Sequence, residues 1–449
     1  VMCVAIFALG CGPSAPRRQL VLDPPNVILI LADDLALGDL SFVNQGQTYT
    51  PHLDQLFETG LWFSQAYSAS AVCAPARASL LTGLYPHQTG CVSLNMQRFP
   101  GLTRIAPQLE TMADAFLAQG YATGLIGKWH GGKGEGYHPL DRGFQEFEGF
   151  IGADQVPSYF NYRLESNQVK RAYDQRYLTD DLTQRSLEFI RRHQNEPFFL
   201  HLAHYAPHRP IEAPQAYLEK YLDQGFNEAT ATVYAMIEVM DQGIGQLIEA
   251  LDTLGLREKT LIIFSSDNGP DPLIGSRENQ GLRGSKYTVY EGGIRVPWLI
   301  NWPGTVAPGR TNEVIHFTDL FPTLVECCVL DPPTSHALIG RSLVESWLTP
   351  SPNPDTTLRY WQWNRGLPDY SHNAAVRRGK WKLVRPYQTR QIPEGPSQQA
   401  PVLYDLSVDP SEQHNVAESH PQVYQSLRTR LAAWSQAVEA DRLKNLGQR

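Results

Sequence analysis

A cysteine, a proline and an arginine stand close together in the segment 70–83. Cys73 lies among small residues, Pro75 fixes the next turn, and Arg77 follows four residues after the cysteine. The segment then has the pattern of a short helix that ends at Gly83. A helix N-terminus offers unpaired N–H groups and a partial positive charge, so a reactive group at Cys73 would face an anion with Arg77 nearby. The pattern predicts a nucleophile position, although a buried structural cysteine beside a surface arginine also fits it.

Acidic and amide side chains follow two apolar runs, at 26–32 and 260–265, that have the pattern of strands buried on both faces of a parallel sheet. The carboxyl ends of such strands face the crevice where open α/β sheets bind ligands, although a lone Asp-Asp pair also fits a cap or turn. Three carboxylates and an amide suit a hard cation, and their mixed types favour calcium over magnesium. No Cys/His cluster has zinc spacing, which argues against zinc. The candidate ligands are Asp33, Asp34, Asp267 and Asn268.

The segment that begins at Cys73 resembles the signature of the sulfatase family, which is Cys-x-Pro-x-Arg followed by a small-residue helix and Thr-Gly; Ala76 stands where the commonest pattern has serine. In that family a formylglycine-generating or anaerobic sulfatase-maturing enzyme oxidises the cysteine to Cα-formylglycine. The resemblance therefore implies that the nucleophile at position 73 is a hydrated aldehyde, activated by a metal ion, and not the thiol. Similarity spans about residues 24–330, and the family's C-terminal pattern recurs at 376–383 and 403–406.

The resemblance also implies roles for the remaining candidates. Asp33, Asp34, Asp267 and Asn268 would bind calcium together with an oxygen of the modified Cys73. Arg77, Lys128 and Lys286 would neutralise the sulfate oxygens. His208, with Lys286, would protonate the departing alcohol, and His130 would take a proton as the aldehyde is restored. Taken singly, each lysine or histidine also fits an ordinary solvated or satisfied side chain.

Buried strands and amphipathic helices must position these residues. Strand patterns lie at 26–32, 121–126, 197–203, 260–265 and 296–302, and helical patterns at 51–59, 109–117, 179–192, 233–251 and 320–329. Their alternation predicts an α/β fold in which helices sandwich a mostly parallel sheet, and the resemblance makes it alkaline-phosphatase-like. Beyond the Pro-rich stretch 331–354, a hairpin at 374–384 and a final helix predict a smaller α+β subdomain. The expected divisions are 1–23, a leader and tether; 24–345, the catalytic domain; and 355–449, the C-terminal subdomain.

Composition limits the class of protein and its compartment. Hydrophobic residues make up 42% and charged residues 19% of the chain, as in globular proteins, and the net charge of −8 argues against nucleic-acid binding. The apolar run 1–10 reads as part of a signal peptide, and Gly10-Cys11 resembles a lipobox, so that either lipid anchoring at Cys11 or cleavage nearby is open. We expect an exported protein: periplasmic, secreted, or an outer-membrane lipoprotein. If the leader is removed and Cys73 is modified, Cys91, Cys327 and Cys328 remain of the six cysteines, and these make no disulfide framework.

The sequence leaves the substrate open. A sulfuric ester hydrolase acting on a sulfated saccharide or aryl sulfate is the leading hypothesis; a phosphate or phosphonate ester hydrolase and a non-catalytic binder of sulfated glycans are the alternatives. Trp361, Trp363 and Tyr370 could stack on a sugar ring or pack the join between two domains.

Overall fold

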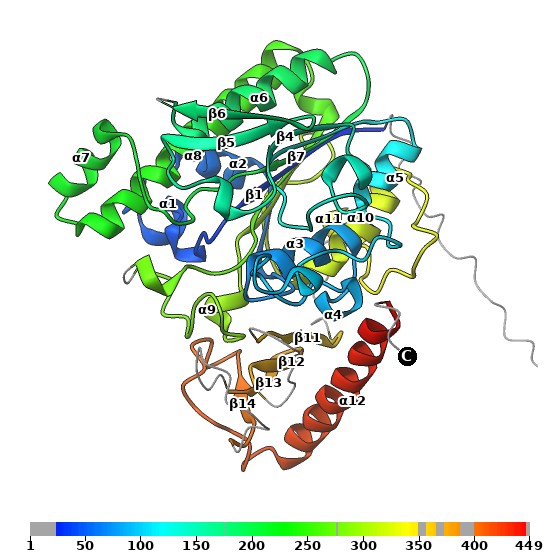
Figure 1. The fold of residues 1–449 in the computed structure, drawn as a ribbon. Coiled ribbons are helices and arrows are strands. Elements are labelled where there is room, and N and C mark those ends of the chain that lie inside the picture. The colour runs from blue at the N-terminus through cyan, green and yellow to red at the C-terminus, as the bar shows by residue number, and fades with distance from the viewer. Residues whose placement is uncertain are drawn as a thin grey trace, which may run out of the picture.

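The computed structural model describes residues 24–174, 176–274, 277–348, 356–364, 372–386 and 399–445. In that part of the chain a ten-stranded sheet forms the centre of the larger domain (Figure 1). Its strands are β1 (Asn26–Ala32), β2 (Leu61–Tyr67), β3 (Ala122–Lys128), β4 (Glu146–Phe150), β5 (Asn161–Ser166), β6 (Val169–Asp174), β7 (Phe198–Ala203), β8 (Thr260–Ser266), β9 (Trp298–Asn301) and β10 (Gly309–His316).

The strand order is β10-β2-β9-β8-β1-β7-β3-β4-β5-β6. β1 runs parallel to both β7 and β8, β3 is parallel to β7 and β4, and β10 is parallel to β2. β9 runs antiparallel to β8 and β2, and β5 and β6 form an antiparallel hairpin at the edge. The predicted mostly parallel α/β sheet is confirmed.

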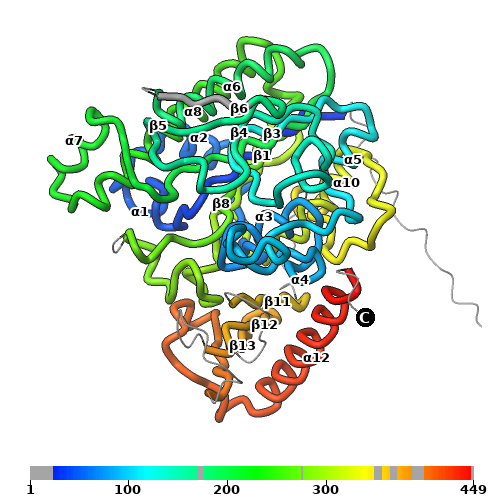
Figure 2. Tube along the Cα trace, in the orientation of Figure 1, coloured from blue at the N-terminus to red at the C-terminus, as the bar shows by residue number. Residues whose placement is uncertain are grey.

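Helices cover both faces of the sheet, and each face has its own hydrophobic core (Figures 1 and 2). Alternate residues of β1 enter the two cores, Val27, Leu29 and Leu31 on one face and Ile28, Ile30 and Ala32 on the other. One core includes residues of α3 (Cys73–Thr82), α5 (Met112–Ala118), α10 (Leu320–Cys327) and α11 (Val344–Leu348). The other includes residues of α2 (Pro51–Thr59), α6 (Leu178–Arg192), α7 (Gln215–Asp223) and α8 (Glu228–Thr253). The described part of the domain also contains the short α-helices α1 (Ser41–Asn44), α4 (Pro86–Thr89) and α9 (Glu291–Ile294).

The N-terminus of α2 is capped by a residue from another helix. Thr50 occupies the N-cap position before Pro51, but its side chain makes no capping hydrogen bond. Asp241 of α8 accepts hydrogen bonds from the backbone N–H groups of Leu53 at 2.7 Å and His52 at 3.1 Å. A residue of a distant helix therefore caps α2 in place of the Thr50 side chain.

The C-terminal subdomain is an antiparallel sheet with one packed helix, as predicted. Its described strands follow the order β11 (Arg359–Gln362), β12 (Ala374–Arg378), β13 (Trp381–Arg385) and β14 (Val402–Asp405), and α12 (Pro421–Asn445) lies against them. The end of α12 reaches the larger domain, where Asn445 donates to the Gln88 carbonyl at 2.7 Å. Figure 2 shows this orange and red subdomain against one side of the main body.

Two of the candidate aromatic residues pack the join between the domains. Trp361 is buried and its Nε1 donates to the Ser68 carbonyl at 2.7 Å, and Trp363 lies 5.6 Å from the ring of Tyr287. Tyr370 lies outside the described residues. The sugar-stacking alternative therefore does not apply to the two tryptophans.

Several predictions fall partly or wholly outside the described residues. The leader 1–23, including Cys11, and part of the predicted boundary at 345–355 are among them, so the domain limits stay predictions. The described cysteines, Cys73, Cys91, Cys327 and Cys328, are free and buried. In the described ranges, no helix is both long and apolar enough to cross a membrane.

Candidate active site

The two acidic pairs meet at the carboxyl ends of neighbouring strands. β1 and β8 are parallel and in register, with Ala32 opposite Ser266, so Asp33 and Asp267 emerge side by side. The backbone N–H of Asp34 donates to Asp267 Oδ1 at 3.2 Å. All four predicted ligands are fully buried. Asp34 adopts a positive φ of 64°, an uncommon conformation outside glycine, which turns the chain sharply where the strand ends.

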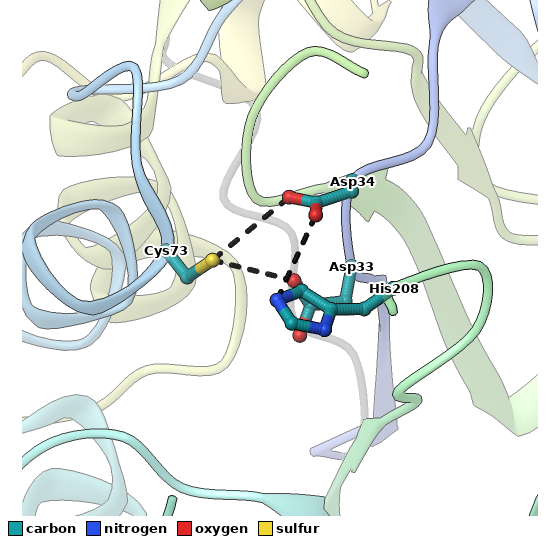
Figure 3. A group of neighbouring side chains, drawn as sticks. All are labelled: Asp33, Asp34, Cys73 and His208. Carbon is teal, nitrogen blue, oxygen red and sulfur yellow. Dashed lines mark hydrogen bonds and ion pairs between the residues drawn. The ribbon is translucent and has the colours of Figure 1, made fainter. Parts of the chain in front are cut away.

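Cys73 is the first residue of α3, and it faces the carboxylates (Figure 3). Its Sγ lies 3.4 Å from Asp33 Oδ1 and 3.9 Å from Asp34 Oδ1. Gly83 ends the helix in the left-handed conformation, with a φ of 70°, as the sequence predicted. Burial, together with the negative charges of Asp267 and Asp33, raises the pKa of the Cys73 thiol well above its ordinary value. The thiol is therefore protonated at neutral pH and is a poor nucleophile as it stands.

Three buried cations neutralise the carboxylates. Arg77 donates through Nε to Asp267 Oδ2 at 2.8 Å, and its Nη2 lies 3.3 Å from Asp33 Oδ2. Lys128 Nζ lies 2.5 Å from Asp33 Oδ2. Lys286 Nζ lies 2.7 Å from Asp34 Oδ2. Burial alone would raise the pKa of Asp33, but the charges of Lys128, His208 and Arg77 outweigh it and hold that pKa well below its usual range.

His208 approaches the carboxylates from the loop after β7. Its Nε2 lies 3.7 Å from Asp34 Oδ2, and its Nδ1 lies 2.6 Å from the Arg209 carbonyl. Because a carbonyl only accepts, Nδ1 carries a hydrogen and Nε2 is the atom that takes up or releases a proton. Burial lowers the pKa of His208 to about 4 although the charge of Asp33 opposes it. In this environment the ring is neutral near pH 7.

His130 lies at the edge of the group. Its Nε2 is 3.0 Å from the Leu94 carbonyl, so Nε2–H donates there, and the buried Nδ1 has no hydrogen-bond partner among the described residues. Burial, with the positive charges of Lys128 and Arg77, lowers the pKa of His130 well below its ordinary value. The hydrogen bond of His130 runs to Leu94 and not to Cys73, but its open Nδ1 is a proton acceptor.

The arrangement fits a hard cation. Asp33, Asp34, Cys73 and His208 each offer a ligand atom, all within 4.8 Å of one another (Figure 3). Asn268 Nδ2 donates to Asp34 Oδ1 at 2.7 Å, while its buried Oδ1 has no hydrogen-bond partner in the described part of the chain. A buried amide oxygen without a partner is costly, and a cation would satisfy it. Asp267 accepts hydrogen bonds from the Asp34 N–H at Oδ1 and from Arg77 at Oδ2. The structure thus brings His208, predicted as the proton donor, next to the predicted ligands.

Three further side chains around the site were not predicted from the sequence. Tyr205 stacks on the His208 ring with centroids 4.6 Å apart, and Tyr159 donates its hydroxyl to the His208 carbonyl at 3.0 Å. Arg277 Nη2 donates to the Asp34 carbonyl at 3.1 Å. Tyr205 lies just beyond the predicted strand 197–203, a position that could have drawn attention to it. The other two lie in irregular segments that carry no periodic signal.

These features define a class of site: one that suits hydrolysis of an anionic ester, at the carboxyl end of a mostly parallel sheet, with buried carboxylates that suit a cation and three positive side chains around them. The chain belongs to the sulfatase family, whose model, described as Sulfatase, matches residues 25–328, and it is a sulfuric ester hydrolase. A second model, described as N-sulphoglucosamine sulphohydrolase, C-terminal, matches residues 284–437.

Known relatives are similar in sequence to this protein over most of its length. Human arylsulfatase A is 33% identical over 477 residues, which cover 94% of this chain and 89% of the relative. The N-acetylgalactosamine-6-O-sulfatase of Bacteroides thetaiotaomicron is 29% identical over 492 residues, covering 90% and 91%. Among solved structures, Ps i-CgsB in complex with k-i-k-neocarrahexaose has a TM-score of 0.81 at 29% identity and covers 92% of this chain and 93% of its own.

Proposed function

We propose that this enzyme hydrolyses the sulfate ester of a sulfated saccharide, or of an aryl alcohol, with Cys73 converted to Cα-formylglycine and with a bound calcium ion. The observation that supports the proposal most is the convergence of Cys73, Asp33, Asp34 and His208 within 4.8 Å. Two relatives carry saccharides in their names: an N-acetylgalactosamine-6-O-sulfatase and a protein bound to k-i-k-neocarrahexaose. A formylglycine-generating or anaerobic sulfatase-maturing enzyme would be the partner that converts Cys73.

The buried, protonated state of the Cys73 thiol supports the conversion, because an unmodified side chain there lacks nucleophilic character. The hydrated aldehyde would supply the nucleophilic hydroxyl. Asp33, Asp34, Asp267 and Asn268 would hold calcium together with an oxygen of the modified residue 73, and calcium would supply positive charge for the sulfate and the nucleophile.

The surrounding side chains have separate tasks in this proposal. Arg77, Lys128 and Lys286 bind the sulfate oxygens and stabilise the negative charge that develops on them. His208 passes a proton through Nε2 to the departing alcohol. Because the ring is neutral as it stands, Nε2 first takes that proton up from the ammonium of Lys286, which contacts the same Asp34 oxygen. His130 accepts a proton at Nδ1, the atom left open by the hydrogen bond to Leu94.

The experiment combines mass spectrometry with turnover. Protein co-expressed with a maturing enzyme should show the peptide of Cys73 lighter by about 18 Da, because oxygen replaces sulfur and two hydrogens. Cys73→Ala should lose release of sulfate from an aryl sulfate and from sulfated saccharides while remaining folded. Cys91→Ala, a change at a buried cysteine outside the site, is the control and should keep turnover. Full activity of Cys73→Ala, or of wild type whose Cys73 stays a thiol, would overturn the proposal.

We also propose that the mature enzyme works outside the cytoplasm. The apolar run 1–10 resembles part of a signal peptide, and Gly10-Cys11 at its end resembles a lipobox. Cell fractionation and palmitate labelling of wild type and Cys11→Ala test this. Recovery of the full-length protein only in the cytoplasm would contradict it.

A further inference from the structure

A pocket of about 520 Å³ lies beside His208, within the range of about 300–1,000 Å³ that ligand sites occupy. Its wall is mostly apolar apart from a few polar groups, and it includes Val156, Tyr205, His208, Arg209, Ile211 and Leu273. Leu273 is 53% exposed at the rim. Because His208 forms part of both the pocket and the carboxylate cluster, the pocket adjoins the place where the alcohol would leave.

Arg209 is fixed at this pocket by a buried acid. Its Nε donates to Asp271 Oδ2 at 2.7 Å, and the Asp271 side chain is fully buried. Asp271 Oδ1 accepts from the backbone N–H of Leu273 at 2.9 Å, so the acid is held on both sides. The Arg209 side chain remains 41% exposed, and its two terminal Nη groups have no hydrogen-bond partner among the residues that the structure describes.

Arg209 lies next to the residue that would protonate the leaving group. It directly follows His208, and its carbonyl accepts the hydrogen bond from His208 Nδ1. His208, which would protonate the alcohol oxygen, and Arg209, which lines the pocket, are therefore neighbours in sequence. The hydrogen bond between them fixes their relative position. Apolar walls suit the C–H face of a sugar ring, and a guanidinium whose two Nη groups can both donate suits a carboxylate or sulfate.

We propose that Arg209, oriented by Asp271, binds a second anionic group, a carboxylate or a further sulfate, on the saccharide that carries the scissile ester. The inference rests on the proposed function and deepens it: the preferred substrate class is a saccharide with at least two negative charges. Arg209 is a specificity-determining residue for the leaving group, and Asp271 is its positioning residue.

Kinetics with matched substrates test the proposal. The substrates are 4-nitrophenyl sulfate, a monosulfated neutral disaccharide, its disulfated analogue, and a sulfated disaccharide that contains a uronic acid. Arg209→Ala should raise KM for the two substrates with a second anion by about tenfold or more, as expected for loss of a hydrogen bond to a charged group. Arg209→Lys should restore part of the affinity. The kcat/KM for 4-nitrophenyl sulfate should change by less than about twofold.

Two further variants separate positioning from general structural effects. Asp271→Asn should raise KM for the same two substrates and leave kcat/KM for 4-nitrophenyl sulfate unchanged. Arg192→Ala is the matched control, since Arg192 is also partly exposed, at 44%, and paired with an acid, Glu146, on another part of the surface. Equal effects of Arg209→Ala on all substrates, or no effect on those with a second anion, would overturn the proposal.

Calorimetric binding to the Cys73→Ala protein separates this proposal from the proposed function. Tighter binding of the substrates with a second anion, lost in the Cys73→Ala/Arg209→Ala protein, would support the subsite even if wild type released no sulfate. Sulfate release by wild type together with equal binding of mono- and dianionic saccharides would reject the subsite and leave the proposed function intact.

Discussion

Charge balance among buried side chains controls what the site can bind. Arg77, Lys128 and Lys286 pair with the three buried carboxylates, and none of these side chains has appreciable contact with solvent. A sulfate ester would compete with the carboxylates for the same cations. A divalent ion bound to the carboxylates would compensate their charge and release the cations to the ester.

Removing divalent cations should therefore abolish turnover. After exhaustive chelation we expect sulfate release from an aryl sulfate to fall to background and to return with calcium, and less fully with magnesium, which demands stricter octahedral geometry. Circular dichroism before and after chelation controls for unfolding. Unchanged activity in protein that elemental analysis shows to be free of metal would contradict the metal assignment.

The decrease in kcat caused by removing the proton donor should depend on the leaving group of the substrate. His208→Ala should lower kcat by about 10²–10⁴-fold for a saccharide sulfate, whose alkoxide is a poor leaving group. The loss should be much smaller for 4-nitrophenyl sulfate, whose phenolate departs without assistance. His193→Ala, which alters a histidine paired with Glu146 and Glu196, is the control. Equal losses on both substrates would argue against His208 as the proton donor.

The candidate site was predictable where its residues follow regular elements. The two acidic pairs could be predicted to lie together, because each follows a continuously apolar strand and such strands lie side by side in the buried part of a parallel sheet. Cys73 could be placed at the start of a helix, because a proline near the beginning and a glycine at the end mark that helix. The orientation of Arg277 and Tyr159 could not be predicted, since both lie in irregular segments whose path depends on tertiary packing. The involvement of His208 with the carboxylates depends on the loop after β7, which brings a residue far from Asp34 in sequence to 3.7 Å.

At the scale of single elements, the distant cap of α2 makes a measurable difference. Asp241→Ala removes the acceptor for two backbone N–H groups and should lower the free energy of unfolding by about 1–2 kcal/mol. Asp241→Asn keeps one acceptor oxygen and should lose less. Asp252→Ala, an exposed change on the same helix, should stay within about 0.5 kcal/mol of wild type. Urea unfolding monitored by circular dichroism measures these differences; equal values for Asp241→Ala and Asp252→Ala would show that the cap is unimportant.

Strands and helices differed in how far their sequences revealed them. β1, β7 and β8 are continuously buried and were predicted, as was the striped helix α8. β5, which lies next to the edge strand β6, has exposed and buried residues mixed along its length and gives little hydrophobic signal. The antiparallel direction of β9 could not be predicted from the local sequence either, because strand direction depends on the path of the long connection from β8.

At the scale of the whole molecule, a buried polar network joins the two sheets. Lys382 Nζ of β13 lies 2.8 Å from Glu291 Oε1 and 2.9 Å from Glu412 Oε1. Tyr67 of β2 donates its hydroxyl to Glu291 Oε2 at 2.6 Å and accepts a hydrogen bond from Arg377 of β12. Because buried ions are costly when unpaired, this network favours one orientation of the subdomain against the main body.

Glu412 is the member of this network whose charge should respond to pH. Burial raises the pKa of Glu412 to about 7, with Lys382 opposing the rise and Glu291 adding to it. A glutamate in an unfolded chain titrates near pH ~4.3, so the folded protein binds more protons at this position between the two values. The stabilising contribution is complete below about pH 4 and is lost as the pH rises through about 7.

Replacing Glu412 with an uncharged isostere should remove that dependence. Glu412→Gln has no group to titrate there, so the free energy of unfolding of wild type minus that of the variant should fall as the pH rises from about 5 to about 7.5. Urea unfolding at several pH values measures the difference, and Glu418→Gln, an exposed change in the same segment, should run parallel to wild type. A wild-type curve parallel to that of Glu412→Gln would mean that the carboxylate is already ionised at the join, with Lys382 outweighing burial and Glu291.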